Sequence, residues 1–168
     1  MSSVNRPFIP LVNGNKFFCY CGKIFSNLDS WSEKTKIGEA TFAPGIIFAD
    51  DDDVAPDVTW ISNERLAMAL KDDGHFHIAP ELVIEVMSFG KENERRDRET
   101  KLKLYSRRGV DEYWIANWRT RQIEVFRREN AALKLVATLN DSDTLTSPLL
   151  PGFSCKVASL FTHYQISK

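Results

Sequence analysis

The sequence predicts a mixed α/β fold in which one central β-sheet is flanked by helices. Three observations support this prediction. Residues 82–86 are apolar apart from Glu85, as is typical of a strand that is buried on both faces. A charged helical pattern follows over residues 92–108 and ends at Gly109. Three further strand patterns come after that helix, which favours one mixed sheet over separate domains.

Shorter elements are expected on either side of this central unit. Before it we expect a helix at 22–37, strand material at 40–49 broken by Pro44-Gly45, a strand at 58–61 and a helix at 64–71 with Asn63 as its N-cap. Asp50 to Asp53 are expected to form a solvated turn, with attraction of a cation as the alternative. After the central helix we expect strands at 112–116, 122–126 and 133–139, a turn at 149–153 and a helix at 157–164.

The composition narrows the class of protein. The chain has 168 residues, of which 43% are hydrophobic and 27% charged, values typical of a soluble domain with its own core. No apolar run approaches the roughly 18 residues that cross a membrane, so we expect no membrane partner. The first residues lack the apolar stretch of a signal peptide and the three cysteines lack framework spacing, which predicts a cytoplasmic location.

Positive charge is concentrated in one segment of a chain whose net charge is −1. Residues 91–108 contain eight basic and four acidic residues, a local net charge of +4. Two interpretations remain open for this segment. It is either a solvated helix face with ion pairs such as Asp97 with Lys101, or a surface that faces the phosphates of a nucleic acid.

Asp57 and Glu85 are the candidate catalytic carboxylates. A carboxylate within a buried strand costs several kcal/mol unless a cation or hydrogen-bond donor pairs with it, so Glu85 requires a partner. Two carboxylates at a sheet edge can hold Mg²⁺ through oxygen ligands, and Lys101 can stabilise developing negative charge. The alternatives are a turn-capping Asp57, a core Glu85 paired with an arginine, and a solvated Lys101.

Spaced motifs give the chain a resemblance to a known family. They are Pro56-Asp57-Val58, the stretch Pro-Glu-Leu-Val-Ile-Glu-Val-Met-Ser at 80–88, Asp-Arg-Glu-Thr-Lys at 97–101, Tyr105, Gly-Val-Asp-Glu-Tyr-Trp at 109–114 and Ser-Pro-Leu-Leu-Pro-Gly-Phe at 147–153. Over residues 38–161 this set resembles the Uma-two family, bacterial restriction-endonuclease-like proteins of the PD-(D/E)XK nuclease superfamily.

The resemblance implies a restriction-endonuclease-like fold with a metal site at one edge of the sheet. Asp57 matches the aspartate of the Pro-Asp motif and Glu85 the acidic residue of (D/E)XK, so both are expected to bind Mg²⁺ or Mn²⁺. Met87 replaces the lysine of that motif, and Lys101 matches the lysine that this family carries on the next helix. Tyr105 and Asp97 are expected to support the site.

The beginning of the chain departs from the family pattern. Residues 1–37 lack the usual segment of the type Tyr-Glu-Leu-Ile-Asp-Gly-Glu. We therefore expect a shortened, atypical N-terminal segment with one helix at 1–37, followed by a nuclease-like domain at 38–168. The loss of a first strand and its glutamate is expected to weaken metal binding.

The leading functional prediction is a metal-dependent DNA endonuclease. Arg95, Arg96 and Arg98 are expected to neutralise the DNA backbone, and a homodimer would suit cleavage of both strands. The first alternative is an inactive relative that binds nucleic acid or protein, and the second is a structural or oligomerising domain.

Two further groups of residues, histidines and tryptophans, are candidates for function. His75 and His77 are expected to belong to a loop or an edge strand rather than to a metal site. Trp60 and Trp114 are expected in the core, whereas Trp118 is expected to be exposed and able to stack on bases.

Overall fold

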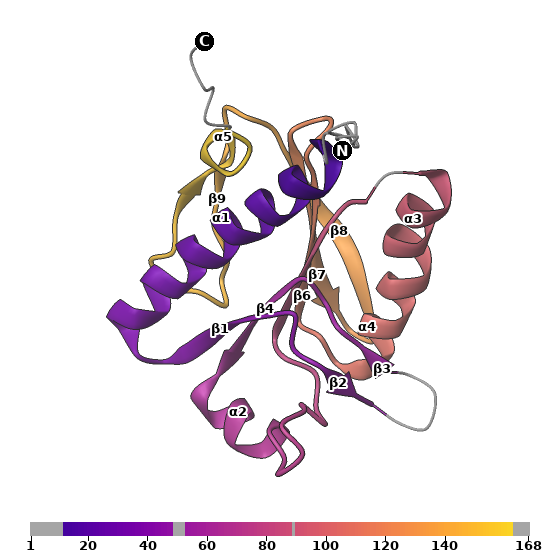
Figure 1. The fold of residues 1–168 in the computed structure, drawn as a ribbon. Coiled ribbons are helices and arrows are strands. Elements are labelled where there is room, and N and C mark those ends of the chain that lie inside the picture. Colours follow the sequence, from indigo (N-terminus) through magenta and orange to yellow (C-terminus); the bar gives the residue numbers. More distant parts are fainter. Residues whose placement is uncertain (1–11, 49–52, 89, 163–168) are drawn as a thin grey trace, which may run out of the picture.

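A six-stranded sheet forms the centre of the molecule (Figure 1). The computed structural model describes residues 12–48, 53–88 and 90–162, with side chains from residue 17 onward. The strands lie in the order β1 (Gly38–Phe42), β4 (Val58–Ser62), β5 (Leu82–Val86), β6 (Glu112–Asn117), β7 (Gln122–Glu129) and β8 (Ala132–Leu139). Only β5 and β6 are parallel, so the sheet is mixed, as predicted.

Helices cover both faces of this sheet (Figure 1). The long helix α1 (Val12–Thr35) crosses one face. The connection from β5 to β6 covers the other face and consists of α3 (Lys91–Arg95), a π-helical segment η1 (Arg96–Lys101) and α4 (Leu102–Arg108). A parallel strand pair needs such a crossover, because the chain has to return to the same end of the sheet.

Side chains of β5 alternate between the two layers. Leu82, Ile84 and Val86 pack in the cluster that contains the buried stripe of α1, whereas Val83 packs in the cluster that contains Leu104 and Tyr105 of α4. Because successive strand residues point to opposite faces, Glu85 lies on the α4 side of the sheet. The prediction that Trp60 and Trp114 belong to the core is confirmed, since both are buried.

Several element boundaries differ from the prediction. Helix α1 begins at Val12 instead of residue 22, because Asn13, Gly14 and Asn15 are poor helix formers and hide the helical pattern. The strand material at 40–49 divides into β1 and the short β2 (Ile46–Ile47), on either side of the predicted break. The closing helix α5 (Val157–Leu160) ends four residues earlier than expected.

The cap of helix α2 (Asn63–Ala69) was assigned one residue too late. Ser62 is the N-cap, and its Oγ accepts a hydrogen bond from the Arg65 backbone N–H at 3.1 Å. Ser and Asn are both good caps, so the sequence alone does not separate two adjacent candidates. The predicted turn at Asp50 to Asp53 lies mostly outside the described residues, although Asp53 itself begins the short strand β3 (Asp53–Val54).

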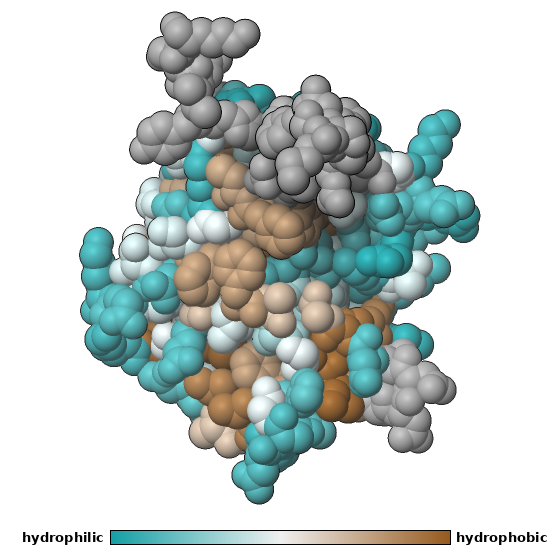
Figure 2. Space-filling view, viewed as in Figure 1, coloured by the Kyte–Doolittle hydropathy of each residue, from teal (hydrophilic) through white to brown (hydrophobic). Residues whose placement is uncertain are grey.

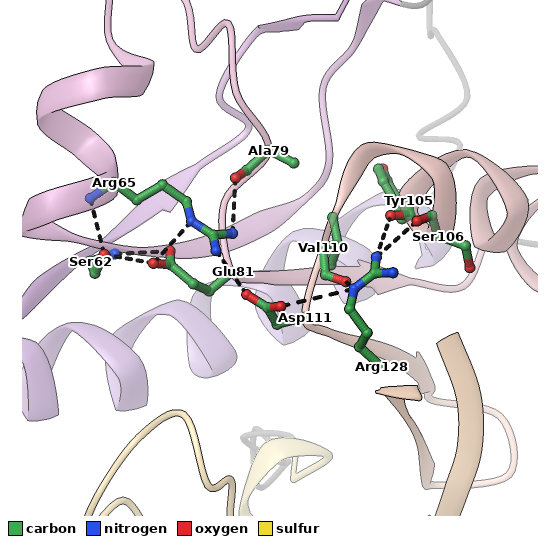
Figure 3. A network of polar contacts seen from close by, with 9 residues as sticks. All are labelled: Ser62, Arg65, Ala79, Glu81, Tyr105, Ser106, Val110, Asp111 and Arg128. Atoms are coloured by element: carbon green, nitrogen blue, oxygen red, sulfur yellow. Dashed lines mark hydrogen bonds and ion pairs between the residues drawn. The ribbon is translucent and has the colours of Figure 1, made fainter. Parts of the chain in front are cut away.

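An ionic network joins the elements at the N-terminal ends of β5 and β6 (Figure 3). Arg65 of α2 pairs with Glu81 at 3.2 Å and with Asp111 at 2.9 Å. Arg128 of β7 donates to the carbonyl oxygens of Val110 at 2.9 Å and Ser106 at 2.8 Å. These contacts hold both parallel strands at the end of the sheet away from Glu85.

The C-terminal segment closes the α1 side of the sheet. It contains β9 (Thr144–Leu145) and β10 (Cys155–Lys156), which pair with each other. Glu112, which is buried, accepts hydrogen bonds from Trp114 Nε1 at 2.6 Å and Ser147 Oγ at 2.9 Å, and so ties this segment to β6. In the described ranges, no helix combines the length and apolarity needed to cross a membrane.

The packing of α1 gives the first prediction. Leu28 is fully buried between α1 and the sheet, so Leu28→Ala should lower the free energy of unfolding by about 2–5 kcal/mol, measured by urea denaturation. The exposed Glu33→Ala on the same helix is the control and should change it by less than about 0.5 kcal/mol. Equal effects of the two substitutions would show that α1 does not pack on the sheet.

Candidate active site

Adjacent antiparallel strands bring Asp57 and Glu85 together. Val58 pairs with Ile84 in the β4–β5 ladder, so the preceding Asp57 lies beside the following Glu85. Both carboxyl groups line the same small cavity, and the charge of Asp57 acts to raise the pKa of Glu85. Asp57 also contacts the backbone, since its Oδ2 accepts the Val86 N–H at 2.7 Å.

Glu85 is the centre of the site. Its side chain is almost fully buried, and its Oε2 is 2.9 Å from Lys101 Nζ. Its Oε1 accepts a hydrogen bond from Tyr105 OH at 2.8 Å. Both oxygens of this buried carboxylate therefore have a donor from the helical crossover, which is the compensation that its position in the strand requires.

Lys101 connects Glu85 to a third acid. Its ammonium is 3.0 Å from Asp97 Oδ1, which confirms the predicted ion pair between these helical residues. Asp97 is also buried, and its carbonyl oxygen accepts a hydrogen bond from Tyr113 OH at 3.2 Å. The structure thus brings together five of the predicted site residues: Asp57, Glu85, Asp97, Lys101 and Tyr105.

The π-helical segment η1 supplies Asp97 and Lys101. Such segments are rare and are frequent at functional sites, because the wider turn redirects side chains relative to a regular α-helix. Here the segment occupies the middle of the crossover, between two regular helical pieces. It faces the C-terminal half of β5, where Glu85 lies.

Burial controls the protonation of these groups. Burial raises the pKa of Glu85 to about 7, an effect that the Lys101 ammonium opposes and the nearby Asp57 reinforces. Burial also raises the pKa of Asp57 above its ordinary value. Burial alone would lower the pKa of Lys101, but Glu85 and Asp97 together raise it, so this side chain stays charged. Burial and then Glu85 raise the pKa of Tyr105, which remains a neutral donor.

Two cavities flank the Glu85–Lys101 pair. The first has a volume of about 120 Å³, and its lining is mostly polar and includes Asp57, Glu85, Asp97 and Lys101. The second, of about 320 Å³, lies toward Thr100 and Tyr105 and shares Glu85 and Lys101 with the first. Glu85 and Lys101 therefore border a cavity on each of two sides.

Phe17 and Arg96 also line the first cavity. The sequence pattern did not single out Phe17, because the helix was expected to begin after it. Arg96 lines both cavities, whereas Arg95 and Arg98 line neither. Arg95 pairs with Glu99 at 3.1 Å, and Arg98 pairs with Glu124 at 3.0 Å.

The other candidates lie outside this site. His77 and His75 contact Asp73, at 2.9 and 3.6 Å, in a loop, and no group of three or more His, Cys, Asp or Glu side chains within the described ranges is arranged to hold a metal. Trp118 was expected to be exposed, which is wrong. It is half-buried, stacks on Tyr20 and donates to the Met87 carbonyl at 2.9 Å.

Comparison with known proteins agrees with this architecture. A protein from Anabaena variabilis, whose crystal structure is described as "a putative nuclease belonging to DUF820", superposes with a TM-score of 0.67 at 18% identity, covering 87% of this chain and 80% of that one. The type IIG restriction endonuclease BpuSI gives a TM-score of 0.40 at 14% identity, over 84% of this chain and 15% of that one. A comparison with curated proteins finds no match.

The family model also covers the first helix, which was expected to be atypical. The Uma2 model, described as "Putative restriction endonuclease", matches residues 13–158 and thus spans nearly all of α1 together with the complete sheet. This match, over a fold that resembles a nuclease structure, shows that the chain belongs to the Uma2 family.

Proposed function

We propose that the protein is a divalent-metal-dependent endonuclease that hydrolyses phosphodiester bonds of DNA. The observation that carries this proposal is the pairing of the half-buried Asp57 with the buried Glu85, with the Lys101 ammonium 2.9 Å from Glu85. Two carboxylates and a lysine at one point of a sheet are suited to phosphodiester chemistry, in which negative charge has to be neutralised. The family's description as a restriction endonuclease supports the same reaction and a DNA substrate.

The donor set fits Mg²⁺ or Mn²⁺. These ions prefer oxygen ligands, and Mg²⁺ is usually bound through one or two carboxylates while it keeps several waters. Asp57 and Glu85 provide two carboxylates beside a small polar cavity, where a cation would balance their charge. Asp57 and Glu85 would hold the metal, which when bound would activate a water molecule for attack on the phosphate.

The protein's own groups prepare this site for the reaction. Tyr105 fixes Glu85 through its hydroxyl, and the Val86 N–H fixes Asp57, so both carboxylates are oriented before a metal binds. Lys101 has three donors, of which Glu85 and Asp97 take two. The third is available to a phosphate oxygen in the first cavity, where it would stabilise the charge that develops during hydrolysis.

Plasmid nicking tests the catalytic role of Glu85. Glu85→Gln keeps the shape of the side chain but removes a metal-binding charge, so nicking with Mg²⁺ or Mn²⁺ should fall by about 100-fold or more. Glu112→Gln is the matched control, because Glu112 is equally buried but lies in a different polar cluster, and this variant should retain activity. Equal nicking by wild type and Glu85→Gln would overturn the proposal.

Calorimetry separates catalysis from binding alone. Wild type should bind Mn²⁺, and Asp57→Asn should weaken this binding by about 10-fold or more because one of two carboxylate ligands is lost. If wild type binds DNA without binding Mn²⁺ or Mg²⁺, the chain is instead an inactive relative that acts as a nucleic-acid-binding module.

The pKa of Glu85 predicts how stability depends on pH without metal. Because the pKa rises from an ordinary 4.5 to about 7 on folding, the folded chain holds a proton that the unfolded chain releases between these values. The stabilisation is complete below the lower pKa and is lost as pH rises through the upper one, by up to about 3 kcal/mol. In EDTA, wild type should lose more free energy of unfolding between about pH 5 and pH 8 than Glu85→Gln, which cannot ionise. An identical pH dependence of the two proteins in urea denaturation would contradict the raised pKa.

A further inference from the structure

We propose that Arg96 is the residue that binds the DNA phosphate at the mouth of the active site, and that Arg95 and Arg98 do not. This inference rests on the proposed endonuclease function. It assigns different roles to three neighbouring arginines, which the sequence alone does not distinguish: Arg96 binds phosphate, and Arg95 and Arg98 do not.

Arg96 differs from Arg95 and Arg98 first in its position beside the site. Arg96 contributes to both cavities beside the Glu85–Lys101 pair, one of about 120 Å³ and one of about 320 Å³. Neither Arg95 nor Arg98 lines either of them. A phosphate that enters the site from either cavity therefore meets the Arg96 side chain and not those of its neighbours.

Arg96 differs from Arg95 and Arg98 also in the partners of its side chain. Arg95 pairs with Glu99, and Arg98 with both Glu94 at 3.5 Å and Glu124 at 3.0 Å. The Arg96 side chain is exposed, and within the described part of the chain it has no hydrogen bond or ion pair. The planar guanidinium carries five donors in a fixed fork, which suits bidentate binding of a phosphate.

The charges that line the first cavity also favour Arg96 as the phosphate-binding residue. Three acids, Asp57, Glu85 and Asp97, line the first cavity, and Lys101 is already paired with two of them. The acidic lining repels a phosphate until cations offset it. Among the described residues that line this cavity, Arg96 is the cation that pairs with no described carboxylate, so it can offset the phosphate itself.

The π-helical backbone explains why Arg96 differs from its neighbours. Arg96 is the first residue of η1, and Lys101 is the last. In a π-helix, residues five apart are linked by the backbone hydrogen bond, so Arg96 and Lys101 lie one above the other on the same face. Arg96 and Lys101 both line the two cavities, whereas Arg95 belongs to the preceding α-helical piece and Arg98 pairs with Glu124. Hydrophilic residues cover α3 in Figure 2, in keeping with a solvated surface here.

Salt-dependent DNA binding tests the assignment. Affinity for a short duplex is measured by fluorescence anisotropy at several NaCl concentrations, with Ca²⁺ replacing Mg²⁺ and a gel to confirm that the DNA stays intact. Arg96→Ala should weaken binding by about 10-fold at low salt and reduce the slope of log K against log salt by about 1, because one phosphate contact is lost. Arg96→Lys should restore the slope, since the charge returns.

Arg95→Ala is the matched control, because it removes the same charge one residue away from an equally exposed position. It should leave the slope within error of wild type, and all variants should melt at the wild-type temperature. If Arg96→Ala and Arg95→Ala reduce the slope equally, or neither does, Arg96 has no special role. If wild type itself does not bind DNA, the proposed function fails as well, so the two failures are distinguishable.

Discussion

The need to compensate one buried carboxylate organises this structure. Glu85 lies within the central strand β5 with 2% of its surface exposed, where an isolated charge would cost several kcal/mol. Lys101 and Tyr105 of the helical crossover offset this cost by donating to Glu85. The neighbouring strand β4 places Asp57 beside Glu85. The crossover between β5 and β6 thus covers one face of the sheet. It also supplies the Lys101 and Tyr105 side chains that donate to Glu85, so the fold and the site depend on the same contacts.

This arrangement holds opposing charges in a fixed geometry before any ligand arrives. Lys101 stays charged between Glu85 and Asp97, because these two acids raise its pKa. Burial raises the pKa of Asp57 and of Glu85. Groups that are held in this way need little rearrangement when a charged substrate binds, which is how preorganised sites lower reaction barriers. The network of Arg65, Glu81 and Asp111 stabilises the N-terminal ends of β5 and β6 (Figure 3). The polar groups of the candidate site lie at the opposite end of β5, around Glu85.

Much of this site could be predicted from sequence because its determinants are local. An apolar run identified β5, and the spacing of Asp97 and Lys101 indicated that they share a helix face. What could not be predicted depends on contacts between distant segments or on backbone geometry. Trp118 is covered because Tyr20, about a hundred residues earlier, stacks on it. The π-helical turn that carries Arg96, Asp97 and Lys101 leaves no mark on a 3.6-residue pattern.

We propose above all that Asp57 and Glu85 together bind one divalent cation in the cavity that both line. Anomalous diffraction from crystals of the protein soaked in Mn²⁺ tests it most directly. The account predicts one strong Mn²⁺ peak within about 2.2 Å of a carboxylate oxygen of each residue, and no such peak in Glu85→Gln crystals. A Mn²⁺ peak elsewhere in the molecule, or none in wild-type crystals at saturating Mn²⁺, would contradict it.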